Sequence, residues 1–569
     1  MTCVAAIQLS SNDCVDDNLT SCLRMIDLAA QDKPRLMVLP EFCNHISWYD
    51  DMDHAWSVAL DIDGAFLQAI AGRALQHQSY IVINVSLRRV KPSITVTSLL
   101  FSPEGSCVLE SDKQTLMGHE NDFFVRADHL APVISTPVGR LGLFPCRDGV
   151  TFETPRGLAL RGAQIFCDSL NSFALDEASL HVPVRAPENK AFLIAANKVG
   201  PLIPEAQLSV VSEAAHIPVE FLLGAGESQI VAPDGSVLAK APRDGEAVIF
   251  ADIDIELTFS KCRPDGSDVF LNRRPELYAA LVEQPSDMQL TQGYTDANVA
   301  SDVAVALVRA PALAVDEAAL SGVAAQIAAL GDDVELVVLP ELFWCADAVV
   351  HNPHKEAAFS EKVQVELTRL CAEQGVHIAT SLVEASASGF QHVAVLTGPQ
   401  GRLASQPQLH RAERHRWAQL GDELKFFDLP WGRCALLTGD DSVYPELVKV
   451  LALQGVHMLL LPFDCQESWE NNFGLLSRAA ENRMCVVASS RATPSGSGLV
   501  CSLESEFTIM TEWHSREFDG NINYPITTHQ HDAVTRAVIH PAAAANKLMS
   551  MNTDLLLQRP WHLSQTLVS

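Results

Sequence analysis

The stretch LMVLPE at residues 36–41 decides the fold, because the chain repeats it almost unchanged as LVVLPE at residues 336–341. In both places an apolar run typical of a strand is followed by a proline and a glutamate. A repeat is sought before single elements are assigned, since a missed repeat leads to a wrong fold. The two copies indicate a chain of two similar halves.

The repeat continues beyond this stretch at a constant offset of 293 residues. A match without gaps over such a length of sequence is not a chance similarity between short apolar stretches. The matching pairs are Gly139-Arg140 with Gly432-Arg433, Leu158-Ala159-Leu160 with Leu451-Ala452-Leu453, Arg185-Ala186 with Arg478-Ala479, and Glu188-Asn189 with Glu481-Asn482.

A polar stretch near residues 283–298 separates the halves. We therefore expect a first domain over 1–283, a linker over 284–300 and a second domain over 301–569. Within each half, apolar runs typical of strands alternate with Ala-rich helical stretches, which predicts an α/β fold with helices covering the sheet faces. The clearest runs are 4–9, 80–85, 303–308 and 458–461 for strands, 18–30 and 317–330 for helices, and Pro233-Asp234-Gly235 for a hairpin turn.

Composition excludes several classes of function. The formal charge of -30, from 40 Lys+Arg against 70 Asp+Glu, disfavours binding to nucleic acid or anionic membrane surfaces. We find no secretion signal and no run of the roughly 18 apolar residues that could span a bilayer, so we expect a cytoplasmic protein. The 14 cysteines include no CxxC pair and predict reduced thiols.

Three residues of the first half, Glu41, Lys113 and Cys146, stand at ends of predicted strands, where α/β folds often place reactive groups. A thiolate can attack an amide carbonyl, and a neighbouring carboxylate such as Glu41 can accept the thiol proton. The ammonium of Lys113 can stabilise the negative charge that builds on the carbonyl oxygen. Each residue taken alone has a structural interpretation, such as a core cysteine or a surface lysine, but their linkage favours catalysis.

This order of motifs, LPE, then lysine, then a strand ending in Cys146 with Asp148 two positions later, resembles the nitrilase superfamily of carbon–nitrogen hydrolases. The Gly-His-Glu run ending at Glu120 resembles N-carbamoyl amidohydrolases, in which a second glutamate orients the lysine and substrate. The Cys-Arg-Asp-Gly run from Cys146 is closer to aliphatic amidases. Two roles are open for Arg147, which could bind a substrate carboxylate or pair with a nearby acidic residue.

The resemblance implies two tandem four-layer αββα sandwich domains arranged as a pseudo-dimer, without cofactor or metal. It implies hydrolysis of a non-peptide C–N bond in a small amide or N-carbamoyl compound through a covalent intermediate on Cys146. A nitrilase, an acyl transferase and a non-catalytic binding or scaffold protein remain as alternatives. Further homo-oligomers stay open. His529 and His531 share a strand face but lack the other ligands of a metal site.

The second half has lost the reactive set. The offset of 293 pairs Lys113 with Gln406, Glu120 with Glu413 and Cys146 with Gly439, so the lysine and the cysteine are lost while Glu341 and Glu413 remain. We therefore expect the second half to be a pseudoenzyme that packs on the first as one subunit of a homodimer packs on its twin. In that position it would complete the first site or cap its interface.

Overall fold

Four six-stranded mixed sheets organise the protein. The computed structural model describes residues 1–285, 299–311 and 313–569, so most of the predicted linker 284–300 lies outside the described residues. In the first half, one sheet has the order β14 (Ala247–Ile253), β1 (Thr2–Gln8), β2 (Leu36–Val38), β3 (Tyr80–Arg88), β4 (Ile94–Phe101) and β5 (Cys107–Asp112). The other has the order β13 (Val237–Lys240), β12 (Gln229–Val231), β9 (Phe192–Ala196), β8 (Ile165–Ser169), β7 (Gly139–Pro145) and β6 (Val133–Thr136).

The second half repeats this topology strand for strand. Its outer sheet runs β26 (Val534–Ile539), β15 (Val303–Val308), β16 (Leu336–Val338), β17 (His377–Ser386), β18 (Gly389–Gly398) and β19 (Gly401–Pro407). Its inner sheet runs β25 (Ile526–His529), β24 (Gly496–Ser502), β23 (Cys485–Thr493), β22 (Met458–Pro462), β21 (Gly432–Leu436) and β20 (Phe426–Leu429). The register also repeats, since Val4 pairs with Leu36 as Val305 pairs with Leu336.

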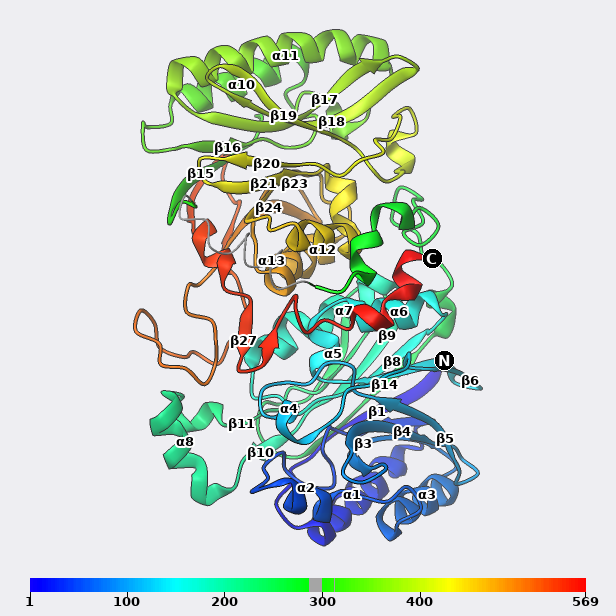
Figure 1. The fold of residues 1–569 in the computed structure, drawn as a ribbon. Helices are drawn as coiled ribbons and strands as arrows, with labels where there is room; N and C mark the ends of the chain where they lie inside the picture. Colours follow the sequence, from blue (N-terminus) through cyan, green and yellow to red (C-terminus); the bar gives the residue numbers. More distant parts are fainter. Residues whose placement is uncertain (286–298, 312) are drawn as a thin grey trace.

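Helices cover both outer faces of each pair of sheets, which gives four layers per half. In the first half these are α1 (Val15–Ala29) and α3 (Ala65–His77) on one side and α6 (Glu153–Leu160) and α7 (Val182–Asn189) on the other. In the second half they are α10 (Asp316–Ala328) and α11 (Pro353–Gln374), then α12 (Pro445–Leu453) and α13 (Leu475–Asn482). The apolar strands are buried on both faces, as the α/β prediction requires. Figure 1 shows the eight layers stacked along the molecule, with α6, α7, α12 and α13 in the middle.

The two halves meet through these four middle helices, and their ion pairs are reciprocal. Arg156 binds Glu446 with 2.8 Å between Nε and Oε1, while the equivalent lysine, Lys449, lies 3.7 Å from Glu153. A second reciprocal set joins α7 to α13. In it Arg185 contacts Glu481 at 2.9 Å and Arg478 contacts Glu188. The same patch on each half thus contacts its own counterpart, which is the geometry of a two-fold dimer within one chain.

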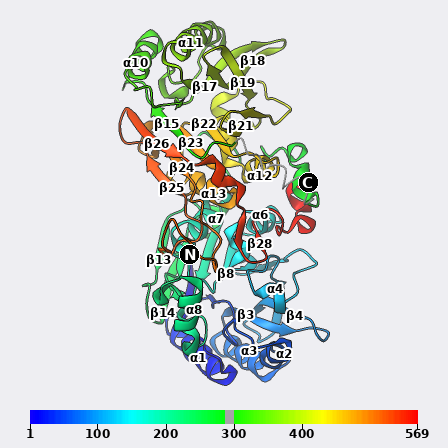
Figure 2. The same cartoon turned by 60° about the vertical axis from the view of Figure 1, so that its left-hand side comes forward.

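The last segment of each half crosses onto the other half. Arg263 and Tyr278, which follow the first-half sheets, contact Asp440 and His410 of the second half. In return the C-terminal residues lie against the first half, where Arg161 donates to Thr566. Figure 2 shows the C-terminus beside α6. Each half therefore supplies a segment that packs against the other half.

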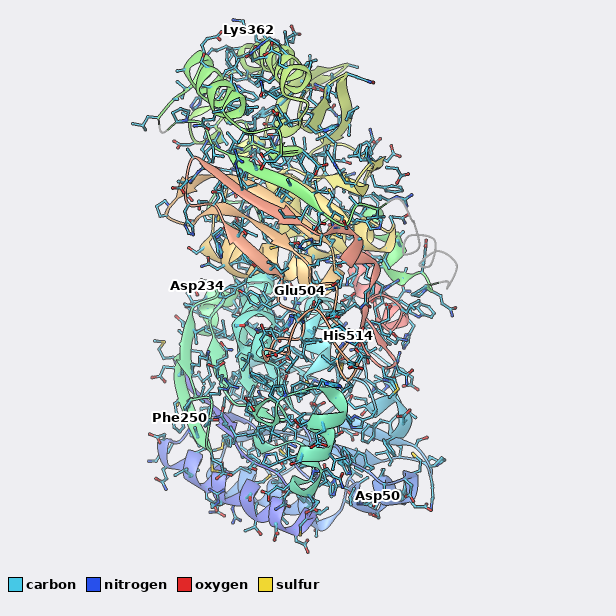
Figure 3. The ribbon with its side chains drawn as sticks, turned by 90° about the vertical axis from the view of Figure 1, so that its left-hand side faces the viewer. Asp50, Asp234, Phe250, Lys362, Glu504 and His514 are labelled. Atoms are coloured by element: carbon cyan, nitrogen blue, oxygen red, sulfur yellow. The ribbon has the colours of Figure 1, made fainter. Side chains whose placement is uncertain are left out.

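One loop breaks the symmetry of the halves. The strands β12 and β13 are joined by the tight turn 232–236, whereas their counterparts β24 and β25 are joined by the long segment 503–525. Phe507, Ile509 and Phe518 of this loop pack on Ala174 and Leu222 of the first half. In Figure 3 Glu504 and His514 of the loop lie between Lys362 at one end of the molecule and Asp50 at the other.

The structure confirms the strands and helices expected from the sequence. The predicted strand at 303–308 is β15, the helix at 317–330 is α10, and Pro233-Asp234-Gly235 lies in the turn between β12 and β13. Among the described residues, none of the helices has the length and apolar character needed to cross a membrane.

Candidate active site

Glu41, Lys113 and Cys146 come together in the first half because their strands end at the same edge of the sandwich. Glu41 follows β2, Lys113 directly follows β5, and Cys146 stands between β7 and the short helix α5 (Arg147–Val150). The Nζ atom of Lys113 lies 2.8 Å from Glu41 Oε1 and 2.9 Å from Glu120 Oε1. Four of the five site residues predicted from the motifs, Glu41, Lys113, Cys146 and Glu120, thus belong to one cluster.

The carboxylates and the lysine of this cluster are almost fully buried. Lys113 and Glu41 are each 1% exposed and Glu120 is 5% exposed. Burial alone would lower the pKa of the Lys113 ammonium, but Glu120 and Glu41 raise it above its usual value, so the lysine stays charged. Burial raises the pKa of Glu41 to about 7 against the opposing effect of Lys113. A carboxyl group with this pKa can both accept and return a proton near neutrality.

The Cys146 backbone adopts a left-handed conformation that non-glycine residues rarely use, with φ at 43° and ψ at -102°. Two aspartates hold this turn. Asp168 accepts a hydrogen bond from the Cys146 N–H at 3.0 Å, and Asp148 accepts from the N–H groups of Gln114 and Thr115 at 2.8 and 2.7 Å. Asp148 therefore ties the turn that carries the thiol to the segment that follows Lys113.

The Cys146 thiol is partly exposed, and its surroundings keep it protonated at rest. Burial and the charge of Glu41 raise the pKa of Cys146, while Lys113 lowers it. A thiol in this state needs a base at the moment of attack, and Glu41 is the carboxylate whose charge acts on it most strongly.

Arg147 directly follows Cys146 in the chain and is a buried residue. It is 2% exposed and does not line the cavity described below. Burial lowers the pKa of its guanidinium, while Glu153 and Asp148 raise it. Glu153 lies on α6, in the interface between the halves. The Nε and Nη1 atoms of Arg147 are buried without a hydrogen-bond partner among the described residues, so the structure shows neither of the two roles that the sequence left open.

Sequence reasoning missed Lys198. Its buried Nζ donates to the carbonyl oxygen of Phe42 at 2.9 Å, directly after Glu41, and burial lowers its pKa to about 8. At the offset of 293 the second half has Arg491, which donates to the carbonyl oxygen of Leu342, the residue after Glu341. A cation at the same offset in both halves was the signal available in the sequence.

A cavity of about 380 Å³ opens beside the cluster, and both halves line it. Glu120 and Asn171 connect it to the reactive residues, because Glu120 holds Lys113 and the backbone of Asn171 hydrogen-bonds Cys146. The second half contributes Ile509, Met510, Ser550 and Met551.

The corresponding position in the second half corrects our assignment of two residues. The strand pairing sets Gln408, not Gln406, in the place of Lys113, since Val393 pairs with Pro407 as Thr97 pairs with Asp112. By the same register His415 takes the place of Glu120, whereas Glu413 is half-buried and pairs with Arg411 and Arg416. The reason is a segment two residues shorter between β19 and β21 than between β5 and β7.

Gly439 does stand in the place of Cys146, because Asp441 accepts from the N–H groups of Leu409 and His410 as Asp148 does in the first half. Its N–H donates to Glu341 Oε2 at 3.1 Å. A Cβ atom at Gly439 would come within 3.0 Å of that oxygen, so the space of the thiol is taken up.

Buried ion pairs fill the second site. Arg414 lies 3.0 Å from Glu341, 3.1 Å from Asp440 and 2.6 Å from Asp464, and Arg263 from the first half binds Asp440 at 2.5 Å. Burial alone would raise the pKa of Glu341, but Arg414 lowers it to about 2. This carboxylate remains ionised and cannot act as a base near neutrality.

Glu341, His392 and His415 bring three groups of the kind that bind metals to within 4.8 Å of one another. Their contacts are those of a hydrogen-bonded network. Arg414 neutralises the carboxylate, and the two ring nitrogens of His392 are engaged by Gln408 and Ser381 at 2.8 and 2.9 Å. The positive guanidinium opposes the binding of a further cation at Glu341.

Comparison with known proteins agrees with the repeat. The sequence model of the family described as carbon-nitrogen hydrolase matches twice, over residues 3–260 and 284–508. A nitrilase from Pyrococcus abyssi is 26% identical over 264 residues, which cover 46% of this chain and 93% of that protein. The nitrilase and fragile histidine triad fusion protein NitFhit of Caenorhabditis elegans is 24% identical over 300 residues, which cover 50% of this chain and 63% of that protein.

Solved structures match about half of the chain. The NitN amidase from Nesterenkonia sp. AN1 is 20% identical with a TM-score of 0.40, covering 48% of this chain and 98% of its own. The structure of C. elegans NitFhit is 22% identical with a TM-score of 0.42, covering 49% and 66%. The two family matches together extend over most of the 569 residues. The chain therefore belongs to the carbon-nitrogen hydrolase family, and its fold is a tandem pair of nitrilase-like α/β domains.

Proposed function

We propose that the first half hydrolyses a non-peptide C–N bond in a small amide, with Cys146 as nucleophile, Glu41 as general base and acid, and Lys113 as the stabiliser of the oxyanion. The observation that carries this proposal is the buried Glu41–Lys113–Glu120 cluster beside a partly exposed thiol in a strained turn. The second half keeps the fold but lacks the lysine and the thiol.

The steps balance on these residues. Glu41 accepts the thiol proton as the Cys146 sulfur attacks the carbonyl carbon, and the negative oxygen that results is stabilised by the Lys113 ammonium. Glu41 then gives its proton to the departing ammonia or amine, which leaves a thioester. A water molecule, deprotonated by Glu41, attacks this thioester and releases the acid, and the proton returns to the thiol.

Two further residues have supporting roles in this proposal. Glu120 positions Lys113, because its Oε2 accepts the Met117 N–H at 2.8 Å and so fixes the carboxylate that binds the ammonium. For Arg147 we favour a role in packing beneath the thiol over contact with substrate, since its side chain is buried among acids and outside the cavity.

Ammonia release from a panel of amides, ureido acids and nitriles tests the proposal in the full-length chain. We expect release from amides by the wild type, loss of at least three orders of magnitude in kcat for Cys146→Ala, and wild-type rates for Cys262→Ala, which removes an exposed thiol. Hydroxylamine as a competing acceptor traps the acyl thioester as a hydroxamate and so tests the covalent intermediate. If no compound turns over, or if Cys146→Ala matches the wild type, the proposal is wrong.

A further inference from the structure

The cavity beside Glu120 has a predominantly apolar wall. Among its described lining residues there is no arginine and no lysine, and the ionisable groups are Glu120, His119 and the phenol of Tyr49. His119 is engaged at Nε2, 2.8 Å from the carbonyl oxygen of Ser47. The apolar part of the wall includes Trp48, Tyr49, Phe123, Phe173, Leu202 and Leu222.

A substrate with its own carboxylate would find no lysine or arginine among the described residues that line this cavity. Lys113 already binds two carboxylates, and Arg147 lies outside the cavity. Burial of an unpaired charge costs free energy. Burial of an alkyl or aryl group is favourable by about 25 cal/mol per Å² of apolar surface. Glu120, which carries the same sign as such a substrate, adds repulsion.

The part of the cavity wall that the second half contributes is held in place by hydrogen bonds, one of which joins the two halves. The strands β27 (Leu548–Ser550) and β28 (Thr553–Asp554) form a hairpin in the second half. The Gly118 N–H donates to Thr553 Oγ1 at 2.8 Å, and this bond joins the hairpin to the loop that carries Glu120. The Ile509 N–H donates to the Met549 carbonyl oxygen at 3.0 Å, which joins this hairpin to the long loop 503–525. Met510 has a left-handed φ of 62°, a conformation that the surrounding contacts must hold.

We infer that the chamber selects neutral amides whose acyl group is a hydrophobic chain or ring, and that Met510 and Met551 of the second half are specificity-determining residues. This inference rests on the function proposed above. Methionine side chains are flexible and polarisable, and they suit a wall that adapts to apolar groups of different shape. The half without the reactive set thereby decides which substrate reaches the half that has it.

Binding to full-length Cys146→Ala, measured by isothermal titration calorimetry, tests the selection without turnover. We use hexanamide as the neutral apolar probe and succinamate and N-carbamoyl-β-alanine as anionic probes. We expect hexanamide to bind at least tenfold more tightly than either anion. Met510→Arg and Met551→Arg, each in the same background, should weaken hexanamide at least fivefold and strengthen succinamate, because each adds a cation to the wall.

Leu548→Arg is the matched control. It adds the same charge close to Met551 in the chain, at a side chain that does not line the cavity, so neither affinity should change. Tighter binding of succinamate by the unaltered wall, or equal effects of all three arginines, would overturn the inference and leave the proposed hydrolysis standing. Selective binding of hexanamide, together with no turnover of any compound in the panel by the wild type, would support the selectivity of the cavity and overturn the proposed hydrolysis.

Discussion

At the scale of single residues, we expect the surroundings of the Glu41 carboxyl group to determine the pH range of the reaction. Burial raises its pKa, Lys113 opposes this, and Glu120 adds to it, with a result of about 7. The folded protein thus holds a proton on Glu41 between the ordinary pKa of a glutamate and 7. In that window the stability contributed by this group falls as pH rises, while its capacity as a base increases.

We expect kcat/KM for a neutral amide to fall about tenfold per pH unit below pH 7, because protonated Glu41 cannot accept the thiol proton. Glu120→Gln should lower kcat and also move this acidic limb to lower pH, since one of the charges that raise the pKa of Glu41 is removed. Rates measured from pH 5 to 9 check both effects. A limb near pH 4.5 in the wild type would contradict the assignment of Glu41.

At the scale of elements, the short segment between β19 and β21 is the reason why we expect the second half to be inactive. It carries Arg414 and His415 into the place where the first half has the loop with Glu120. Glu341, Asp440 and Asp464 surround the Arg414 guanidinium, so this arginine compensates three buried carboxylates. Ion pairs have replaced the reactive groups.

Arg414→Met should lower the free energy of unfolding by about 3–5 kcal/mol, because it removes the cation that Glu341, Asp440 and Asp464 share in a buried site. Arg411→Met is the control, since Arg411 is an exposed residue of the same segment whose pair with Glu413 is worth at most about 1 kcal/mol. Urea unfolding followed by circular dichroism compares the two variants. Equal losses would show that the network around Arg414 does not stabilise the second half.

The sequence was sufficient for the architecture and for the reactive cluster. The repeated LPE stretch, the strand that ends at Cys146 and the lysine between them predicted both, because each motif stands at a strand end that the topology brings to one edge. Gln408 and His415 were missed, since a two-residue deletion inside a loop leaves no mark on the flanking strands. Met510 and Met551 were also missed, because apolar residues in a long loop do not indicate which surface they cover.

At the scale of the whole molecule, the middle helices hold the halves together with fully buried charges. Glu446 of the second half binds Arg156 at 2.8 Å and Arg273 at 2.9 Å, both from the first half. Burial alone would raise the pKa of Glu446, but the two arginines lower it to about 2. Its contribution to stability is therefore present above the ordinary pKa of a glutamate and is lost as the pH falls towards 2.

We expect the wild type to unfold in one cooperative calorimetric transition, since each half is completed by a segment of the other. Glu446→Gln should lower the free energy of unfolding by about 3–5 kcal/mol or split the transition in two, because two arginines lose their buried partner. Glu276→Gln, which alters an exposed carboxylate beside Arg274, should do neither. Two separate transitions in the wild type would contradict the coupling of the halves.

The reciprocal contacts between the halves have a consequence for how such a protein changes. In a homodimer every substitution appears twice, once in each subunit, so a residue that suits one copy must be tolerated by the other. Here the two copies share one chain but not one sequence. Arg263 of the first half can therefore bind Asp440 in the second site, while the equivalent position of the second half is free to carry another residue. In the same way, loop 503–525 of the second half can pack on the first half although the first half has no equivalent loop. Joining the copies removed the requirement of symmetry and made a division of labour between them possible.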